Sequence, residues 1–368
     1  FERGNVQVET DLESNMGGTS FVPSPKGNAE IARTVDREQF YRFLGTTLCG
    51  EDKKVKQRHL PLLVVSRAKS AGTVGEAWLA NLDNTVSELE KMWHISVGDA
   101  LSGGTHALVA NADGEHGEKY VLKIDMPENL GGEFSNSIST LKILDGNGCA
   151  KLYAYDIARK ACLLERLGEP INRLGYSVNE QLQIICGALQ KVWKTPFVND
   201  GLPSGKDSVV WFRQFIGETW EKLNHPCSFQ VIKQAFSYLQ SKEHALNPDE
   251  FVLLHGDAHG GNTLETLSGD GFKLIDPDGI FYEKAYDLGV LMREWVSEYE
   301  QDPMKEGKKR CAYLHHLTGV CEQAIWEWGY LQTVSTAFVL RQIGQEKTGQ
   351  QMLRVAKCWA EETTDILR

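Results

Sequence analysis

The spacing of apolar residues divides the chain into two regions with different predicted secondary structure. The first regular pattern begins at about Leu62, and residues 76–94 place an apolar side chain every three or four positions, which predicts a helix. The elements that follow are strand-like runs at 105–111 and 119–125, a helix at 133–144, and strand-like runs at 151–156 and 161–167. This order predicts a small, mostly antiparallel sheet with one helix packed on it.

Helical periodicity dominates the second region, which follows a connector at 168–170. Helices are predicted over 178–194, 228–243, 286–298, 311–330 and 349–366, and a strand-like pair at about 262–275 interrupts them. A small sheet lobe joined to a larger helical lobe is a bilobal α+β architecture with a cleft between the lobes. The predicted division is an extension over 1–61, an N-terminal lobe over 62–167, and a hinge with a C-terminal lobe over 168–368.

The N-terminal extension differs in composition from the rest of the chain. Residues 1–30 are rich in Gly, Ser, Asn and Pro and show no apolar period, which predicts a poorly ordered tail. Residues 36–48 fit a short helix, and 51–58 form a charged linker. We assign no function to this extension.

Composition and charge exclude several classes of protein. The 368 residues are 24% charged and 41% hydrophobic, and no apolar run approaches the roughly 18 to 20 residues of a membrane span. The first twenty residues are too polar for a signal peptide, and the eight cysteines form no C-x-x-C pair, so we expect a cytoplasmic protein with reduced thiols. A net charge of −11 argues against nucleic-acid binding; it suits a cationic small substrate, or it simply keeps the protein soluble.

The residues that indicate chemistry lie between 251 and 289. One apolar run leads to His255-Gly256-Asp257, with Asn262 five residues after the aspartate, and a second apolar run leads to Asp276. Phosphoryl transfer needs a carboxylate to accept a hydroxyl proton and hard oxygen ligands for magnesium, and this set supplies both. The spacing from Asp257 to Asn262 matches the Asp-x-x-x-x-Asn of kinase catalytic loops. The alternative, a surface turn with solvated acids, does not explain why both acids end apolar runs.

Residues upstream fit a nucleotide site. Lys123 ends the apolar run 120–122, as a lysine that contacts the α- and β-phosphates would, and Glu133 opens the next predicted helix, where it could pair with that lysine. Taken alone, Lys123 would be interpreted as a surface strand residue. Two further segments are candidates for backbone contacts to the nucleotide: Ser102, Gly103, Gly104 and Thr105 over the phosphates, and Glu165 to Leu167, where the lobes join, beside a purine.

Together these segments resemble the aminoglycoside phosphotransferases, a family with the protein-kinase-like fold. The sequence is most similar to the branch that holds streptomycin 6-phosphotransferases and hydroxyurea phosphotransferases. The resemblance runs from about Leu62 to the C-terminus and does not cover residues 1–60. It is carried by residues 75–93, 102–109 (SGGTHALV), 120–125 (YVLKID), 162–167 (CLLERL), 253–262 (LLHGDAHGGN), 273–279 (KLIDPDG) and 285–293 (AYDLGVLMR).

The resemblance implies a role for each matching residue. Asp257 would be the catalytic base, Asn262 and Asp276 the Mg²⁺ ligands, and Lys123, positioned by Glu133, the lysine that holds the phosphates of ATP or GTP. The implied reaction is transfer of the γ-phosphoryl group to a hydroxyl of an aminoglycoside-type antibiotic, streptomycin-like and cationic, giving resistance. The oligomeric state stays open.

Three further residues of this segment receive expectations of their own. His255 would be structural and would orient the catalytic loop. Asp287 resembles a buried aspartate that pins that loop, although an acid stabilised by the helix N-terminus fits equally. Asp278 departs from related sequences, which often carry a basic or neutral residue there; it fits a second metal ligand or, as we favour, a turn acid.

Other functions remain open at this point. A housekeeping kinase for a sugar or amino-alcohol would share the fold and the mechanism. A metal-dependent hydrolase could use the alternating His255, Asp257 and His259 together with Asp276, and a catalytically silent kinase-like binding module would need no turnover. Acidic candidates for contacts to a cationic acceptor are Glu294, Glu298 and Glu327.

Overall fold

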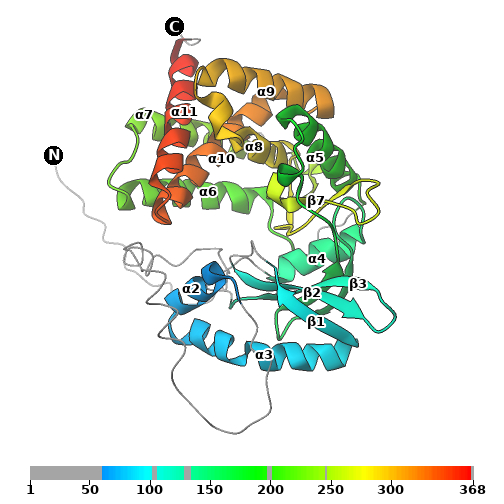
Figure 1. Cartoon of the computed structure of the whole chain (residues 1–368). Helices are drawn as coiled ribbons and strands as arrows, with labels where there is room; N and C mark the ends of the chain where they lie inside the picture. The colour runs from blue at the N-terminus through cyan, green and yellow to red at the C-terminus, as the bar shows by residue number, and fades with distance from the viewer. Residues whose placement is uncertain (1–59, 102–105, 128–133, 197–200, 245–246, 366–368) are drawn as a thin grey trace, which may run out of the picture.

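The computed structural model describes residues 60–101, 106–127, 134–196, 201–244 and 247–365, with side chains up to 361, and these form two lobes (Figure 1). The N-terminal lobe is built on a five-stranded antiparallel sheet in the order β1-β2-β3-β5-β4. Its strands are β1 (Ile95–Ala100), β2 (Ala107–Gly114), β3 (Lys119–Asp125), β4 (Leu152–Asp156) and β5 (Ala161–Glu165). The helix expected at 36–48 lies outside the described residues.

Helices cover both faces of this sheet. Helix α3 (Thr73–Trp93), preceded by α2 (Leu62–Ser70), packs Leu82, Val86 and Leu89 against one face, where Leu122 and Ile124 of β3 meet them in a buried cluster. Helix α4 (Phe134–Leu144) lies on the other side, in a core shared with the helical lobe. Because side chains alternate along a strand, Lys123 points to the face opposite Leu122.

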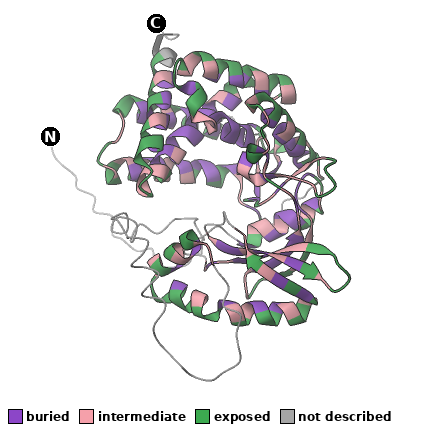
Figure 2. Ribbon diagram, viewed as in Figure 1, coloured by how far each residue is buried: buried purple, intermediate pink, exposed green. Residues whose placement is uncertain are grey.

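The C-terminal lobe is a helical bundle around one long buried helix. Its helices are α5 (Val178–Trp193), α6 (Gly205–Lys222), α7 (Phe229–His244), α8 (Ala285–Arg293), α9 (Pro303–Thr318), α10 (Glu322–Gln342) and α11 (Glu346–Asp365). Helix α10 is buried on most sides along its middle, as the purple segments in Figure 2 show. The short α8 crosses it at two glycines: a Cβ at Gly289 would lie 2.8 Å from the Trp328 backbone, and one at Gly329 would lie 2.6 Å from Cβ of Met292.

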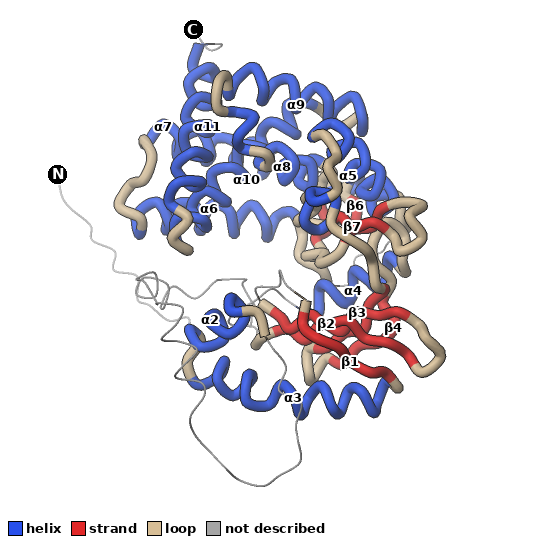
Figure 3. Tube along the Cα trace, in the orientation of Figure 1, coloured by secondary structure: helices blue, strands red, loops and turns tan. Residues whose placement is uncertain are grey.

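Two short two-stranded sheets lie where the lobes meet (Figure 3). Strand β6 (Val252–Leu254) pairs with β9 (Ile280–Tyr282), and β7 (Thr263–Glu265) pairs with β8 (Phe272–Leu274), which confirms the strand pair predicted at about 262–275. The two pairings bring the ends of the segment 255–279 together. They also hold the loops before β7 and after β8 side by side.

Several boundaries differ from the prediction. Strand β1 and helices α2 and α6 were not predicted; β1 buries only Ile95 and Val97, and its register shifts after Val97, so its apolar alternation is weak. The helix expected at 311–330 is two helices, α9 and α10, because Gly319 adopts a left-handed φ of 72° and ends the first. The helix expected at 286–298 ends at Arg293, shortly before Trp295 with φ 51°.

Two of the exclusions can be compared with the structure. In the described ranges, no helix is both long enough and apolar enough to span a bilayer. Within these ranges seven cysteines are not joined in disulfides; they are Cys149, Cys162, Cys186, Cys227, Cys311, Cys321 and Cys358.

The close crossing of α8 and α10 makes Gly289 sensitive to substitution. Gly289→Ala should destabilise the protein by about 1 to 3 kcal/mol, because the added Cβ would press on the Trp328 backbone. Urea denaturation measures this change. Gly187→Ala in α5 is the matched control: its Cβ would meet no described atom within 4 Å, so alanine should raise stability by up to about 1 kcal/mol. Equal stabilities of the two variants would contradict the close crossing.

Candidate active site

The candidate catalytic loop, residues 255–262, follows β6 and is organised by the buried ring of His255. Its Nε2–H donates to the carbonyl of Ile275 over 2.9 Å, and its Nδ1 accepts the backbone N–H of Asp257 over 3.3 Å. Burial lowers the pKa of His255 to about 4, so the ring is neutral at physiological pH. These contacts confirm the structural role expected for His255.

Asp287 fixes the same loop from helix α8. Its carboxylate is fully buried and accepts the backbone N–H groups of Gly256 (2.7 Å) and His255 (3.2 Å) and the indole N–H of Trp193 (2.8 Å). Burial raises the pKa of Asp287 to about 6, against the lowering effect of these hydrogen bonds. Of the two interpretations from the sequence, the aspartate that pins the loop is therefore confirmed.

The carboxylate of Asp257 is held from two sides. Its Oδ1 lies 2.5 Å from Nη2 of Arg293, while its Oδ2 lies 3.5 Å from Nε2 of His259 and 3.4 Å from Nδ2 of Asn262. Burial opposes ionisation of Asp257, but the hydrogen bond from His259 and the charge of Arg293 outweigh it and hold the pKa of Asp257 well below its usual range. Asp257 is therefore ionised and able to accept a proton.

Asn262 and Asp276 lie together because the β7–β8 hairpin joins their loops. The backbone N–H of Ile275 donates to the carbonyl of Asn262 over 2.9 Å, which places Asp276 next to it. The amide Nδ2 of Asn262 donates to the backbone carbonyl of Asp257 over 3.1 Å. Asp276 adopts a left-handed φ of 57°, an unfavourable conformation for a residue with a side chain and one that concentrates at functional sites.

Lys123 reaches across from the sheet to this loop. Its Nζ lies 3.0 Å from Oδ1 of Asp276 and 3.3 Å from Oδ1 of Asp125. Burial disfavours the ammonium, but these two carboxylates outweigh it and raise the pKa of Lys123 above its usual value. Sequence reasoning missed Asp125, although it lies two residues after Lys123 and therefore on the same face of β3.

The described structure does not test the other residues predicted to bind the nucleotide. Ser102, Gly103, Gly104, Thr105 and Glu133 lie outside the described residues. Glu165 places its carboxylate 2.7 Å from Nζ of Lys273, and its backbone N–H donates to the carbonyl of Lys151 over 2.8 Å. That N–H is therefore already engaged, and a purine contact by the backbone between Glu165 and Leu167 stays a prediction.

A small cavity opens beside Asp257 on the side of the helical lobe. Its volume is about 150 Å³, and it is walled by the catalytic loop, α6, α8 and α10. The residues that line it are Trp211, Phe212, Gly256, Asp257, Asp278, Tyr286, Arg293, Gln332, Ser335, Thr336 and Val339. Two carboxylates, one guanidinium and three polar side chains thus meet an aromatic wall.

Asp278 is more than the turn acid that the sequence favoured. The backbone does turn here, since Gly279 has φ 72°, but the carboxyl of Asp278 lies in the cavity with Asp257. Desolvation there and the neighbouring charge of Asp257 raise the pKa of Asp278 to about 7. A second metal ligand at Asp278, the alternative to the turn acid, stays an open interpretation of the sequence.

The acids expected to contact the acceptor have other partners. Glu298 pairs with Arg310 over 2.6 Å, the buried Glu327 pairs with Lys242 over 2.9 Å, and Glu294 lies 3.8 Å from Nε of Arg293. None of the three is among the described residues that line the cavity. Sequence reasoning also gave no role to Arg293 or Trp211, because their positions depend on how α6, α8 and α10 pack.

The arrangement does not suit the metal-dependent hydrolase. Both ring nitrogens of His255 are used in hydrogen bonds to the backbone, so this histidine has no nitrogen to offer a metal. Within the described ranges, no group of three or more His, Cys, Asp or Glu side chains is placed to hold a metal ion.

The chain is similar to known kinases and phosphotransferases in sequence and in fold. The chain is 26% identical over 276 residues to streptomycin 6-kinase from Streptomyces glaucescens, covering 73% of this chain and 87% of that protein. It is 23% identical to hydroxyurea phosphotransferase from Kitasatospora aureofaciens, covering 61% and 65%. Among solved structures, choline kinase LicA from Streptococcus pneumoniae superposes with a TM-score of 0.55 at 16% identity, covering 76% of this chain and 99% of that one. A thermostable aminoglycoside phosphotransferase mutant superposes with a TM-score of 0.53 at 13% identity, covering 75% and 98%.

The fold is the protein-kinase-like fold that these phosphotransferases share. More narrowly, a family model matches residues 92–344, and the chain belongs to the aminoglycoside/hydroxyurea antibiotic resistance kinase family.

The hydrogen bonds to Asp287 predict that even an isosteric change will be costly. Asp287→Asn should lower stability by about 1 to 3 kcal/mol, because its amide group would face backbone N–H donors that the carboxylate now satisfies. Turnover should fall with it as the catalytic loop loosens. Thermal unfolding and steady-state kinetics measure both effects, with Asp249→Asn on the surface as the control. A stable, fully active Asp287→Asn variant would show that the loop does not need this carboxylate.

Proposed function

We propose that this protein is a small-molecule kinase that transfers the γ-phosphoryl group of ATP or GTP to a hydroxyl of a streptomycin-like aminoglycoside, and that it confers resistance by doing so. The observation that carries the proposal is the convergence of Lys123, Asp257, Asn262 and Asp276 from two lobes onto one site. A phosphate-binding lysine, a base and two oxygen ligands are the parts that phosphoryl transfer requires.

The donor set suits a magnesium ion. Asp276 and Asn262 present hard oxygen atoms from adjacent positions of the β7–β8 hairpin, and Mg²⁺ prefers such ligands together with phosphate oxygens. The side-chain nitrogen of Asn262 donates to the backbone carbonyl of Asp257, so the side-chain oxygen of Asn262 is the atom that would bind the cation. When bound, the ion would neutralise charge on the phosphates of the nucleotide.

The chemistry assigned to the protein is proton acceptance and positioning. Asp257 would accept the proton of the acceptor hydroxyl while the oxygen of that hydroxyl bonds to the γ-phosphorus. The bond from the γ-phosphorus to the bridging oxygen breaks, and the nucleoside diphosphate leaves. Lys123 would hold the phosphates, and Asp125 and Asp276 keep its ammonium charged. Since the reaction needs little covalent chemistry, positioning and charge would supply most of the acceleration.

The acceptor would bind in the cavity beside Asp257. A volume of about 150 Å³ is smaller than the 300 to 1,000 Å³ of typical ligand pockets, so it would admit the reacting ring while the rest of the acceptor stays outside. Arg293 already pairs with Asp257, so Asp278 is the acid left to meet a cationic group, whose charge would favour the ionised carboxylate. The similarity to streptomycin 6-kinases supports the same substrate class.

Replacing the base tests the chemistry. Asp257→Asn should retain ATP binding, measured by calorimetry, but lose at least about 100-fold in turnover, because the amide cannot accept the hydroxyl proton. The assay is magnesium-dependent release of ADP or GDP with streptomycin, other aminoglycosides, hydroxyurea, sugars and amino-alcohols as acceptors. Turnover on a sugar or amino-alcohol alone would replace the resistance function with a housekeeping one. A variant that keeps most of its activity would refute the base.

Replacing the aromatic wall tests the acceptor site. Trp211 stacks on Phe215 with ring centroids 4.9 Å apart and lines the cavity. Trp211→Ala should raise the KM of the acceptor roughly tenfold while the KM of ATP changes by less than about twofold, because only the acceptor contacts this wall. Trp326→Ala, in α10 but away from the cavity, controls for the loss of an aromatic ring. Equal changes in both KM values would argue against this placement of the acceptor.

A further inference from the structure

Arg293 is the basic side chain in closest contact with the base among the described residues, and the proposed reaction gives it no role. Its Nη2 lies 2.5 Å from Oδ1 of Asp257, and its Nη1 donates to Oε1 of Gln332 over 2.8 Å and to Oγ1 of Thr336 over 3.0 Å. One end of the guanidinium is thus bonded to α10 and the other to the catalytic loop. Because the group is planar and rigid, fixing one end fixes the direction of the other.

The helices around Arg293 leave it little freedom to move. Gln332 and Thr336 are four residues apart, so both lie on the face of α10 that meets α8. The glycine contacts at Gly289 and Gly329 bring the two helices close, and the Arg293 side chain is only 16% exposed. A different rotamer would break two hydrogen bonds to α10 as well as the ion pair with Asp257.

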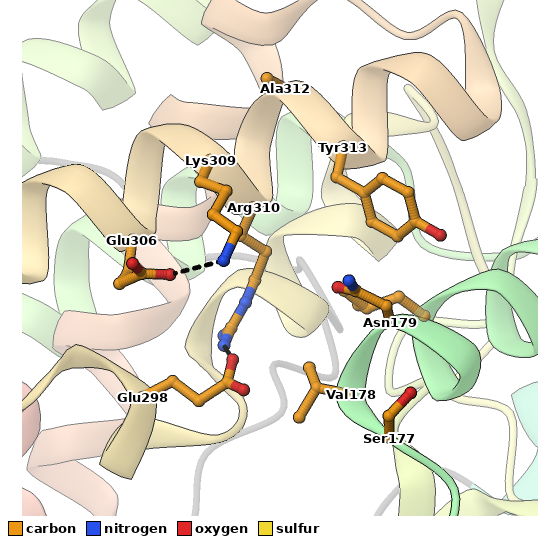
Figure 4. Close-up of a pocket in the computed structure, with 10 residues that line it drawn as sticks. Ser177, Val178, Asn179, Glu298, Glu306, Lys309, Arg310, Ala312 and Tyr313 are labelled. Carbon is orange, nitrogen blue, oxygen red and sulfur yellow. Dashed lines mark hydrogen bonds and ion pairs between the residues drawn. The ribbon is translucent and has the colours of Figure 1, made fainter.

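The backbone that carries Arg293 is also held, by Arg310 of α9. The Arg310 guanidinium donates to the carbonyl of Glu294 over 2.5 Å and lies 3.5 Å from the carbonyls of Leu291 and Met292, at the C-terminal end of α8. It pairs with Glu298 in the wall of a second cavity of about 470 Å³, between α5 and α9 (Figure 4). A buried arginine therefore satisfies the last carbonyls of the helix that ends at Arg293.

The two oxygens of Asp257 consequently differ. Oδ1 is taken by Arg293, whereas Oδ2 has only the longer contacts to His259 and Asn262, at 3.5 and 3.4 Å. We propose that Arg293 is the positioning residue of Asp257: by holding Oδ1 it fixes the plane of the carboxylate and makes Oδ2 the atom that receives the acceptor proton. This inference rests on the proposed phosphotransfer function.

Arg293 neither gives nor receives a proton in this reaction. The proton moves from the acceptor hydroxyl to Oδ2 of Asp257, the acceptor oxygen bonds to the γ-phosphorus, and the nucleoside diphosphate leaves with the electron pair of the broken bond. Arg293 stays protonated throughout, as arginine does in proteins. Because Arg293 acts through Asp257, its loss should change kcat and spare the binding of ATP.

The test measures the kinetics of Arg293 variants. Its acceptor is the compound, among the aminoglycosides, hydroxyurea, sugars and amino-alcohols assayed above, that the wild-type protein phosphorylates fastest. Arg293→Met should lower kcat about 100-fold, a general-base loss, with the KM of ATP changed by less than about twofold. Arg293→Lys should recover only part of kcat, since a single ammonium cannot hold α10 and Asp257 together. In Arg293→Ala, guanidinium chloride at non-denaturing concentrations should restore part of the turnover. Arg213→Met on α6, whose arginine pairs with Glu243, is the control and should keep wild-type kinetics.

Several results would overturn the inference while leaving the proposed function intact. One is wild-type kcat in Arg293→Met while Asp257→Asn is inactive. A second is loss of turnover that guanidinium does not rescue in Arg293→Ala. If Arg293→Met does not fold, the double variant Gln332→Leu/Thr336→Val decides: kcat should fall about tenfold as the tether is lost, and unchanged kcat would refute the role.

A measurement without an acceptor separates the two proposals. If wild-type protein phosphorylates no acceptor, the proposed function fails, but the contact itself can still be tested by a double-mutant cycle in thermal stability. Arg293→Met and Asp257→Asn should then be non-additive, because they remove two partners of one interaction. Additive effects would show that the two side chains do not hold each other.

Discussion

The buried carboxylate of Asp287 is the interaction on which the rest of the site depends. It joins α5, through Trp193, to α8 and to the backbone of the catalytic loop. A buried charge is tolerated only when its hydrogen bonds are complete, so these elements must assemble together. Asp287 lies near the start of α8 and Arg293 at its end, six residues or about 9 Å along the helix axis. One short helix thus holds the catalytic loop at two points.

The sequence was sufficient where the site is local in the chain. Asp257 and Asn262 belong to one loop, and Asp276 follows the strand that pairs beside that loop, so spacing and apolar runs were enough to identify them. Lys123 and Asp287 could be placed because each stands at a recognisable point of a strand or helix. The sequence thus predicted the two lobes and most of their elements in order, except β1, α2 and α6, and it singled out the residues to which the proposal assigns chemistry.

The rest depends on how helices pack, which spacing along the chain does not encode. Arg293 meets Asp257 and Gln332 because glycines let α8 and α10 approach closely, and neither glycine looks special in the sequence. Trp211 faces the cavity because of the orientation of α6, an amphipathic helix too polar to be predicted from apolar period alone. The boundary between α9 and α10 was missed because Gly319, with its left-handed φ, is a single residue inside a continuous helical pattern.

The contacts of β8 have a mechanical consequence for any movement between the lobes. Although β8 lies in the C-terminal lobe by sequence, Leu274 exchanges backbone hydrogen bonds with Gly148 and Ala150, and Lys273 pairs with Glu165 at the end of β5. The strand leading to Asp276 is thus fastened to the sheet that carries Lys123. A rotation of the lobes would have its axis close to these bonds, so the distance between Lys123 and Asp276 would change little. The described residues that wall the cavity beside Trp211 all belong to the C-terminal lobe, so the cavity would move with Asp276 as one body and keep its shape.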